Sequence, residues 1–124
     1  ADEDGDWLPV GETLVGPEAN GQFGSSIALS GDGQTLAISS PNNHADGTSK
    51  GEVFVFRLNG SVWDQAGSSI IGDANLDRFG RSITISHDGT RLAGSSYFHR
   101  AQRGQVRVFD LLDDNEWYLV QEAE

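Results

Sequence analysis

The sequence predicts an all-β fold built from two copies of a four-stranded unit, because one pattern of residues occurs twice in its 124 residues. The pattern contains a tryptophan, a Phe-Gly pair and an Asp-Gly pair, and each of them recurs 56 positions later. The recurring positions include Trp7, Gly11, Phe23, Gly24, Asp32 and Gly33, which return as Trp63, Gly67, Phe79, Gly80, Asp88 and Gly89. Such a period is typical of architectures in which no unit buries its apolar face alone, so each unit needs a stacked neighbour.

Each unit is expected to begin with two strands joined by a tight turn. Residues 23–30 favour a strand through their spaced apolar side chains, and residues 35–40 favour a second one. Asp32-Gly33 lies between them, and this pair readily adopts the positive φ angles of a tight hairpin. Residues 83–92 repeat the arrangement, with Asp88-Gly89 at the turn.

The third strand of each unit is nearly continuous in apolar residues. Residues 52–58 contain the run Val53-Phe54-Val55-Phe56, and residues 105–111 are their counterpart. An unbroken apolar strand is typical of a sheet that is covered on both faces. A fourth strand is expected around Trp63, with equivalents at Trp7 and Trp117.

Four short antiparallel strands with aromatic and glycine residues at fixed places describe one blade of a β-propeller. Gly24 and Gly80 are expected where the chain meets crowded surroundings, because a side chain would not fit there. We therefore expect an acidic tail over 1–6, the outer strand of a neighbouring blade over 7–15, and two four-stranded antiparallel propeller blades over 16–71 and 72–124.

Three segments of the first unit carry a resemblance to a known family. They are Phe23-Gly24-Ser25-Ser26-Ile27-Ala28-Leu29, the turn Asp32-Gly33 with Leu36-Ala37-Ile38 and Pro41, and Gly51-Glu52-Val53-Phe54-Val55-Phe56. Together they resemble the FG-GAP repeats of integrin-α-like propellers, and most of all the tandem Ser-x-Asp-Gly variant of surface or secreted proteins of marine microbes and algae. The resemblance covers residues 7–122 and implies an extracellular or cell-surface propeller.

Two blades are fewer than the roughly four to eight that close a propeller ring. We expect other copies of the chain, further propeller repeats or another component of a complex to cover the exposed sheets, because uncovered faces and edges favour association. These are the partners that the architecture implies.

The formal net charge of −11 limits the remaining partners. An acidic surface repels phosphate backbones and anionic lipids, so we expect neither nucleic-acid binding nor membrane insertion. The chain contains no cysteine, which excludes disulfides and thiolate metal sites.

One loop has the spacing of a calcium site. Asp73, Asn75 and Asp77 alternate along the chain, as the oxygen ligands of calcium loops do. Arg78 stands where such a loop usually has glycine, and the alternative is a solvated acidic turn in which Asp77 caps backbone groups. Calcium is the only cofactor that the sequence suggests.

The Asp-Gly hairpins are a different case. Calcium-binding FG-GAP repeats carry Asp-x-Asp-x-Asp-Gly there, whereas Asp32 and Asp88 each stand as a single carboxylate. One carboxylate does not make a calcium cage, so we expect turn aspartates that bond the local backbone.

A ligand-binding rim is expected at the loops between the second and third strands. In the first unit this loop offers oxygens from Asn42, Asn43 and Asp46. Propellers place it on the same rim as the loop that enters the blade, so we expect 42–50 to lie near 17–22.

The corresponding loop of the second unit differs in character. Aromatic, imidazole and guanidinium groups gather there in Tyr97, His99, Arg100 and Arg103, which suit a sugar or an acidic peptide. By the same rule residues 97–103 should lie near 73–78. The alternative is that the rings cover the blade edge while the arginines pair with the carboxylates of that loop.

The sequence contains no recognisable catalytic arrangement. His44, His87 and His99 belong to none, and Gly24-Ser25-Ser26 lacks the Gly-x-Ser-x-Gly elbow. We therefore predict a non-catalytic module that recognises protein or glycan through its rim loops and serves adhesion. A purely structural subunit of a larger assembly is the alternative, and an enzyme whose site forms between copies is a third possibility.

Overall fold

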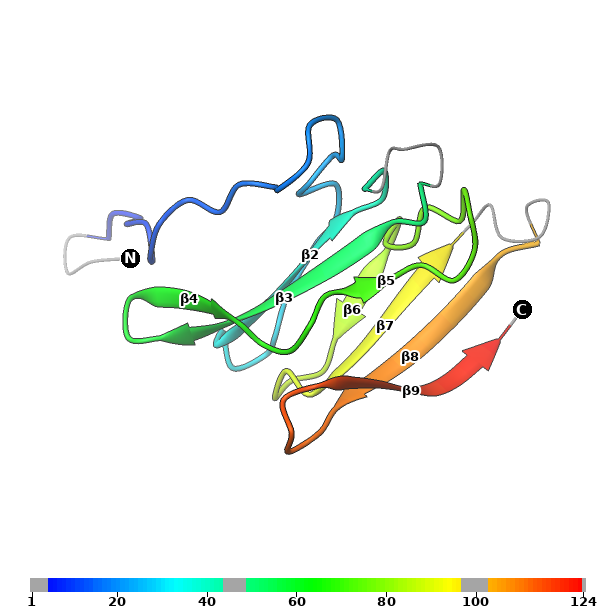
Figure 1. Ribbon diagram of the computed structural model, residues 1–124. Helices are drawn as coiled ribbons and strands as arrows, with labels where there is room; N and C mark the ends of the chain where they lie inside the picture. The colour runs from blue at the N-terminus through cyan, green and yellow to red at the C-terminus, as the bar shows by residue number, and fades with distance from the viewer. Residues whose placement is uncertain (1–4, 44–48, 97–102, 124) are drawn as a thin grey trace.

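The computed structural model describes residues 5–43, 49–96 and 103–123. Within these ranges the chain forms two antiparallel sheets and no helix, and no helix that could span a membrane is found there. Figure 1 shows the sheets packed as two layers. The all-β prediction with one four-stranded unit after another is confirmed.

The first sheet, blade 1, orders its strands β1-β2-β3-β4, and a short β5 also pairs with β3. The strands are β1 (Ile27–Leu29), β2 (Thr35–Ser40), β3 (Glu52–Asn59), β4 (Val62–Gln65) and β5 (Ile70–Ile71). The second sheet, blade 2, has the order β6-β7-β8-β9. Its strands are β6 (Ile83–Ile85), β7 (Arg91–Ser96), β8 (Gln105–Leu111) and β9 (Trp117–Ala123).

The first strand of blade 1 is shorter than predicted, because it begins at Ile27 and not at Phe23. Gly24 has a φ of 90°, which breaks the extended backbone. The approach is nevertheless tied to the sheet, since the Gly24 N–H donates to the Ser39 carbonyl at 2.9 Å.

The two faces of each blade have different roles. The leading face carries Ile27 and Leu29 in blade 1, and Ile83 and Ile85 in blade 2, while the trailing face lies on the opposite side of each sheet. The trailing face of blade 1 packs against the leading face of blade 2. Blade 1 contributes Ala37, Val53, Val55, Ala66 and Ile70 to this core, and blade 2 contributes Phe79, Leu92 and Phe109.

The third strand of blade 1 is covered on one face only. Val53 and Val55 are buried in the joint between the blades, whereas Phe54 and Phe56 on the leading face remain half-buried. The prediction that β3 is buried on both faces is therefore wrong, because no other sheet formed by the described residues covers the leading face of blade 1.

The two sheets converge at one edge. The β6 strand contacts β1 and β2 of the other sheet, so the first strands of the blades lie close together. Sheets that converge at their first strands and fan outward at their fourth have the arrangement of neighbouring propeller blades around an axis. Residues 7–15, which were expected as a strand of a neighbouring blade, lie outside both sheets (blue in Figure 1).

Candidate functional site

The loop predicted to bind calcium forms a tight turn. Asp73 and Asn75 are exposed, whereas Asp77 is buried and accepts a hydrogen bond from the Ala74 N–H at 3.0 Å. Leu76 and Arg78 adopt positive φ angles of 67° and 54° around it. Asp77 thus caps backbone groups, and within the described ranges no three carboxylate or imidazole groups gather for a metal. Calcium binding stays a prediction.

The predicted rim of blade 1 is built around Asn43. This side chain is fully buried, and its amide donates to Glu52 Oε1 at 3.0 Å, while the Ser69 hydroxyl donates to Glu52 Oε2. A Cβ on Gly21 would lie 1.9 Å from Asn43 Oδ1, so the two loops are in direct contact as expected. Asn43 therefore joins the loop to β3 from inside the blade.

The other predicted rim residues are less informative. Asn42 is half-buried, and its N–H donates to the Gly21 carbonyl at 3.1 Å. Arg103 is exposed. Asp46, Tyr97, His99 and Arg100 lie outside the described residues. Ligand binding at either rim stays a prediction.

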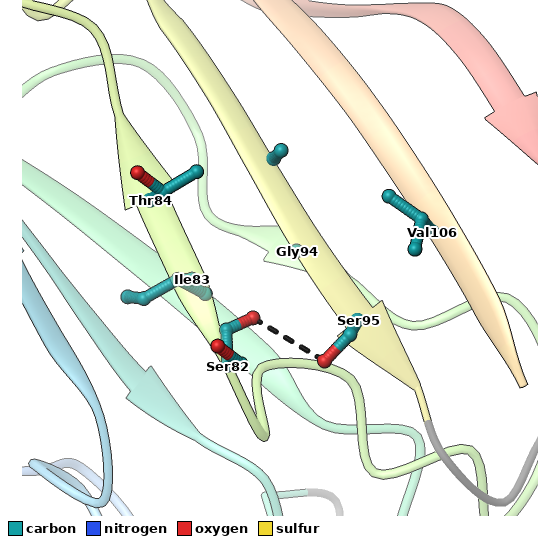
Figure 2. Close-up of a pocket in the computed structure, with 7 residues that line it drawn as sticks. Ser82, Ile83, Thr84, Gly94, Ser95 and Val106 are labelled. Atoms are coloured by element: carbon teal, nitrogen blue, oxygen red, sulfur yellow. Dashed lines mark hydrogen bonds between the residues drawn. The ribbon is translucent and has the colours of Figure 1, made fainter.

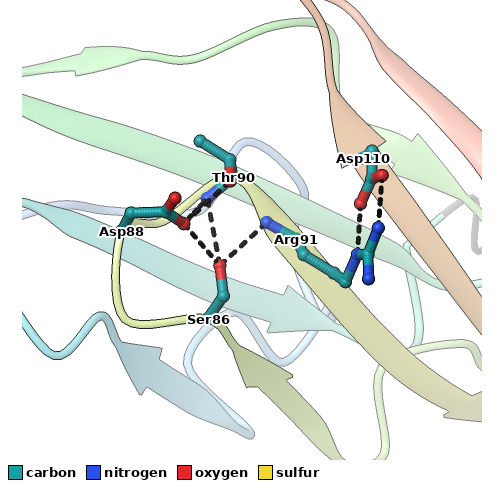
Figure 3. A network of polar contacts seen from close by, with 5 residues as sticks. All are labelled: Ser86, Asp88, Thr90, Arg91 and Asp110. Carbon is teal, nitrogen blue, oxygen red and sulfur yellow. Dashed lines mark hydrogen bonds and ion pairs between the residues drawn. The ribbon is translucent and has the colours of Figure 1, made fainter.

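The two Ser-x-Asp-Gly hairpins have a shared internal structure. In blade 2 the Ser86 hydroxyl donates to Asp88 Oδ1 at 2.9 Å, and the Thr90 hydroxyl donates to the same oxygen at 2.8 Å. Ser86 Oγ in turn accepts the Arg91 N–H at 3.0 Å (Figure 3). In blade 1 the Ser30 hydroxyl donates to Asp32 Oδ1 at 2.6 Å. Each serine and aspartate thus closes the turn after the first strand.

These hydrogen bonds lower the pKa values of Asp88 and Asp32. Hydrogen bonds from the hydroxyl groups of Thr90 and Ser86 lower the pKa of Asp88 to about 2 from its ordinary value of 3.8. The Ser30 hydroxyl and the Gln34 N–H lower the pKa of Asp32 in the same way. Both groups are held as carboxylates with one oxygen engaged, which suits turn closure.

The hairpins also contact each other across the joint, which the sequence did not indicate. The Asp32 N–H donates to the His87 carbonyl at 3.1 Å, and a Cβ on Gly31 would lie 2.1 Å from His87 Nδ1. An imidazole therefore lies between the two hairpins at the converging edge. The only sequence signal is the glycine in the first repeat opposite a histidine in the second.

A second polar contact supports blade 2 beside its hairpin. Arg91 binds Asp110 with two parallel hydrogen bonds, Nε to Oδ1 at 2.6 Å and Nη2 to Oδ2 at 2.7 Å (Figure 3). The two residues face each other across β7 and β8. The hydrogen bond from Arg91 also lowers the pKa of Asp110.

The trailing face of blade 2 is open and slightly hollow. Figure 2 shows the hollow between β6, β7 and β8, lined by Ser82, Thr84, Ala93, Gly94, Ser95 and Val106. Small side chains dominate it, and Val106 is 46% exposed. The corresponding face of blade 1 is the one that receives blade 2 in the joint.

Comparison with known proteins adds the family. Residues 16–56 match the FG-GAP repeat family. This segment, about a third of the chain, is similar to FG-GAP repeats. The second unit repeats the Phe-Gly and Asp-Gly marks of that segment at Phe79-Gly80 and Asp88-Gly89. The narrower likeness to repeats of marine microbes and algae stays a prediction. No curated protein matches the sequence significantly.

Solved propellers share the fold of the two blades. The periplasmic gluconolactonase of Pseudomonas aeruginosa superposes with a TM-score of 0.56 at 21% identity, over 81% of this chain and 27% of that one. A candidate 6-phosphogluconolactonase of Bacteroides fragilis gives a TM-score of 0.55 at 18% identity, over 78% and 24% of the two chains. This chain spans about a quarter of the length of each. At these identities the likeness concerns the fold.

The comparison corrects the functional prediction. We expected a non-catalytic binding and adhesion module, or a purely structural subunit, from the propeller repeats. These two propellers are named as lactonases, so blades of this fold also occur within enzymes. The prediction is therefore wrong, because it took the repeat architecture as a sign of a protein without chemistry.

Proposed function

We propose that the chain forms two consecutive blades of a propeller enzyme that acts on sugar lactones. The observation that carries the proposal is the alignment with two lactonase propellers over about four-fifths of this chain, so that both blades and the joint between them are included. The chain's quarter share of their length is consistent with a contribution to a larger ring.

The uncovered faces support the need for further blades. Ile27 and Leu29 on the leading face of blade 1 are 64% and 60% exposed. Their counterparts Ile83 and Ile85 pack against the core of the joint. Burying apolar surface stabilises a protein by roughly 25 cal/mol for each Å² removed from water. A sheet that covered this face would therefore stabilise the chain.

Charge favours an uncharged lactone as substrate. The chain carries 19 acidic against 8 basic residues, which opposes the approach of a phosphorylated sugar. Lactone hydrolysis adds water to the ring carbonyl and opens the C–O bond, so a base that accepts the proton of the water accelerates it. His87, between the two hairpins at the converging edge, supplies an imidazole for that role.

The test is ring opening of D-glucono-1,5-lactone, followed by alkali uptake at constant pH in each oligomeric fraction of the purified chain. We expect a rate above spontaneous hydrolysis that is proportional to protein concentration, and little hydrolysis of the 6-phosphorylated lactone. His87→Gln keeps a planar polar side chain at the hairpin and should abolish the excess rate. A rate equal to the spontaneous one in every fraction overturns the proposal.

A further inference from the structure

At the joint between the blades, a tryptophan of blade 2 contacts the segment that links β4 to β5 of blade 1. The Trp117 indole N–H donates to the carbonyl of Ala66 at 2.8 Å. The next residue, Gly67, leaves no room for a side chain, because a Cβ there would lie 2.8 Å from Trp117 Cδ1 and 3.0 Å from the Asn115 carbonyl. The segment that completes blade 1 therefore also fastens onto blade 2.

The same contact occurs one repeat earlier. The Trp63 indole N–H donates to the carbonyl of Val10 at 3.0 Å, and a Cβ on Gly11 would lie 2.8 Å from Trp63 Cδ1 and 3.0 Å from the Ser61 carbonyl. Val10 and Gly11 thus lie on blade 1 as Ala66 and Gly67 lie on blade 2. The geometry is repeated along with the sequence.

The flanks of these two contacts differ. Before Ala66 the chain forms β4, and after Gly67 it forms β5, and both pair with β3 of the preceding sheet. Residues 7–15 lie outside both sheets, with Trp7 89% and Val15 82% exposed. Val10 and Gly11 therefore contact blade 1, which follows them in the chain. Among the described residues, however, no third strand of another blade pairs with residues 7–15.

We propose that residues 7–15 are the fourth strand of a further FG-GAP-type blade, one that has three strands of its own and seats on the leading face of blade 1. This inference rests on the proposed propeller, whose ring it extends by one named partner. Strand addition of this kind gains main-chain hydrogen bonds and places alternate side chains against the partner sheet. Trp7, Leu8, Val10 and Val15 are the exposed apolar residues that it would cover.

The leading face of blade 1 fits such a partner. At the joint a Cβ on Gly80 would lie 2.7 Å from Ser39 Cβ and 3.2 Å from Val53 Cγ2, so this glycine meets the trailing face of blade 1 closely. Gly24, its counterpart, has open space within 4 Å. The partner's trailing face is therefore expected to present serine and valine at the positions of Ser39 and Val53.

A second copy of the chain does not meet these requirements. Its open trailing face belongs to blade 2, where β9 already pairs with β8 from Leu111–Trp117 to Val106–Ala123. Residues 7–15 would have to displace that strand. The partner we infer is a blade that has no fourth strand of its own.

A fusion tests the inference. Residues 16–62 of this sequence are duplicated in front of Trp7 in place of residues 1–6, so that Trp7 follows the added third strand in the register of Trp63. Hydrogen exchange, read by mass spectrometry on peptides from 7–15, should slow by about 100-fold relative to the unfused chain. The control carries one inserted glycine before Trp7, which reverses the faces of the strand and should abolish the protection.

Each other outcome contradicts the inference. Unchanged exchange over 7–15 beside a protected added blade overturns it, and so does an added blade that stays unprotected, because residues 7–15 then do not complete it. Protection of 7–15 in the unfused chain that rises with concentration, together with a dimer in sedimentation, identifies a second copy as the occupant instead. Hydrogen exchange and sedimentation do not depend on lactone hydrolysis, so failure of this inference can be distinguished from failure of the proposed function.

Discussion

Gly80 of blade 2 lies against Ser39 of blade 1, so closely that a Cβ on the glycine would be 2.7 Å from the serine Cβ. The Gly80 N–H also donates to the carbonyl of Ser95 in its own sheet at 3.0 Å. The Phe-Gly pair of the repeat therefore places a residue without a side chain where the backbone of blade 2 closely approaches blade 1.

Gly80→Ala should destabilise the chain by about 2–4 kcal/mol, because the methyl group meets Ser39 and Val53 and the residue has a φ of 103°. Gly24→Ala is the matched control, since its φ of 90° imposes similar backbone strain in open space. We expect a loss of about 1 kcal/mol there. Urea denaturation measures both, and equal losses would contradict the close packing at Gly80.

Trp117→Phe should reduce the free energy of unfolding by about 1 kcal/mol or more, since the smaller phenyl ring lacks the indole N–H that donates to the Ala66 carbonyl. Trp7→Phe is the control, because Trp7 is 89% exposed and the change should have no measurable effect. Thermal unfolding followed by circular dichroism compares the two variants. A larger loss for Trp7→Phe would mean that residue 7 is already packed in solution.

Leu92→Ala should cost about 2–5 kcal/mol, because Leu92 is fully buried between the blades. The corresponding residue of blade 1, Leu36, lies on the uncovered leading face and is only half-buried. Leu36→Ala should therefore cost less than half as much. Denaturation midpoints at constant slope test the ratio, and equal losses would indicate that another molecule covers the leading face.

Stability should fall in acid because of the hairpin carboxyls. The pKa of Asp88 is about 2 in the folded chain, below its ordinary value of 3.8, so ionisation favours the folded state. This contribution is fully present above 3.8 and is lost as the pH falls towards 2. Thermal melts across this window should show a steeper decline for the parent chain than for Asp88→Asn.

Thr90→Val offers an independent check of the same hairpin. The Thr90 hydroxyl is the main cause of the lowered pKa of Asp88, so its removal should raise that pKa. The acid decline in melting temperature should then be smaller, because the folded pKa of Asp88 moves back towards its ordinary value of 3.8 and ionisation favours the folded state less. An unchanged profile in both variants would assign acid sensitivity to other carboxyls.

The local features of the fold could be predicted from the sequence. The Asp-Gly turns at 32–33 and 88–89 depend on backbone angles that glycine adopts easily, and both appear where expected. The prediction that the first strand begins at Phe23 was wrong, because the positive φ of Gly24 separates Phe23 from β1. The pattern of apolar residues does not reveal such a break in the backbone. The role of Asn43 as a buried link to Glu52 was also missed, since its partner is set by packing.

The sequence by itself determined the repeat, the all-β character and the places of the turns, because these follow from side-chain period and local backbone preference. Only the tertiary structure decided which apolar face is covered. Ile83 and Ile27 occupy equivalent positions in their strands, yet the first packs in the joint and the second is 64% exposed. Burial depends on which part of the protein packs against the sheet, and the sequence of the strand does not specify that neighbour.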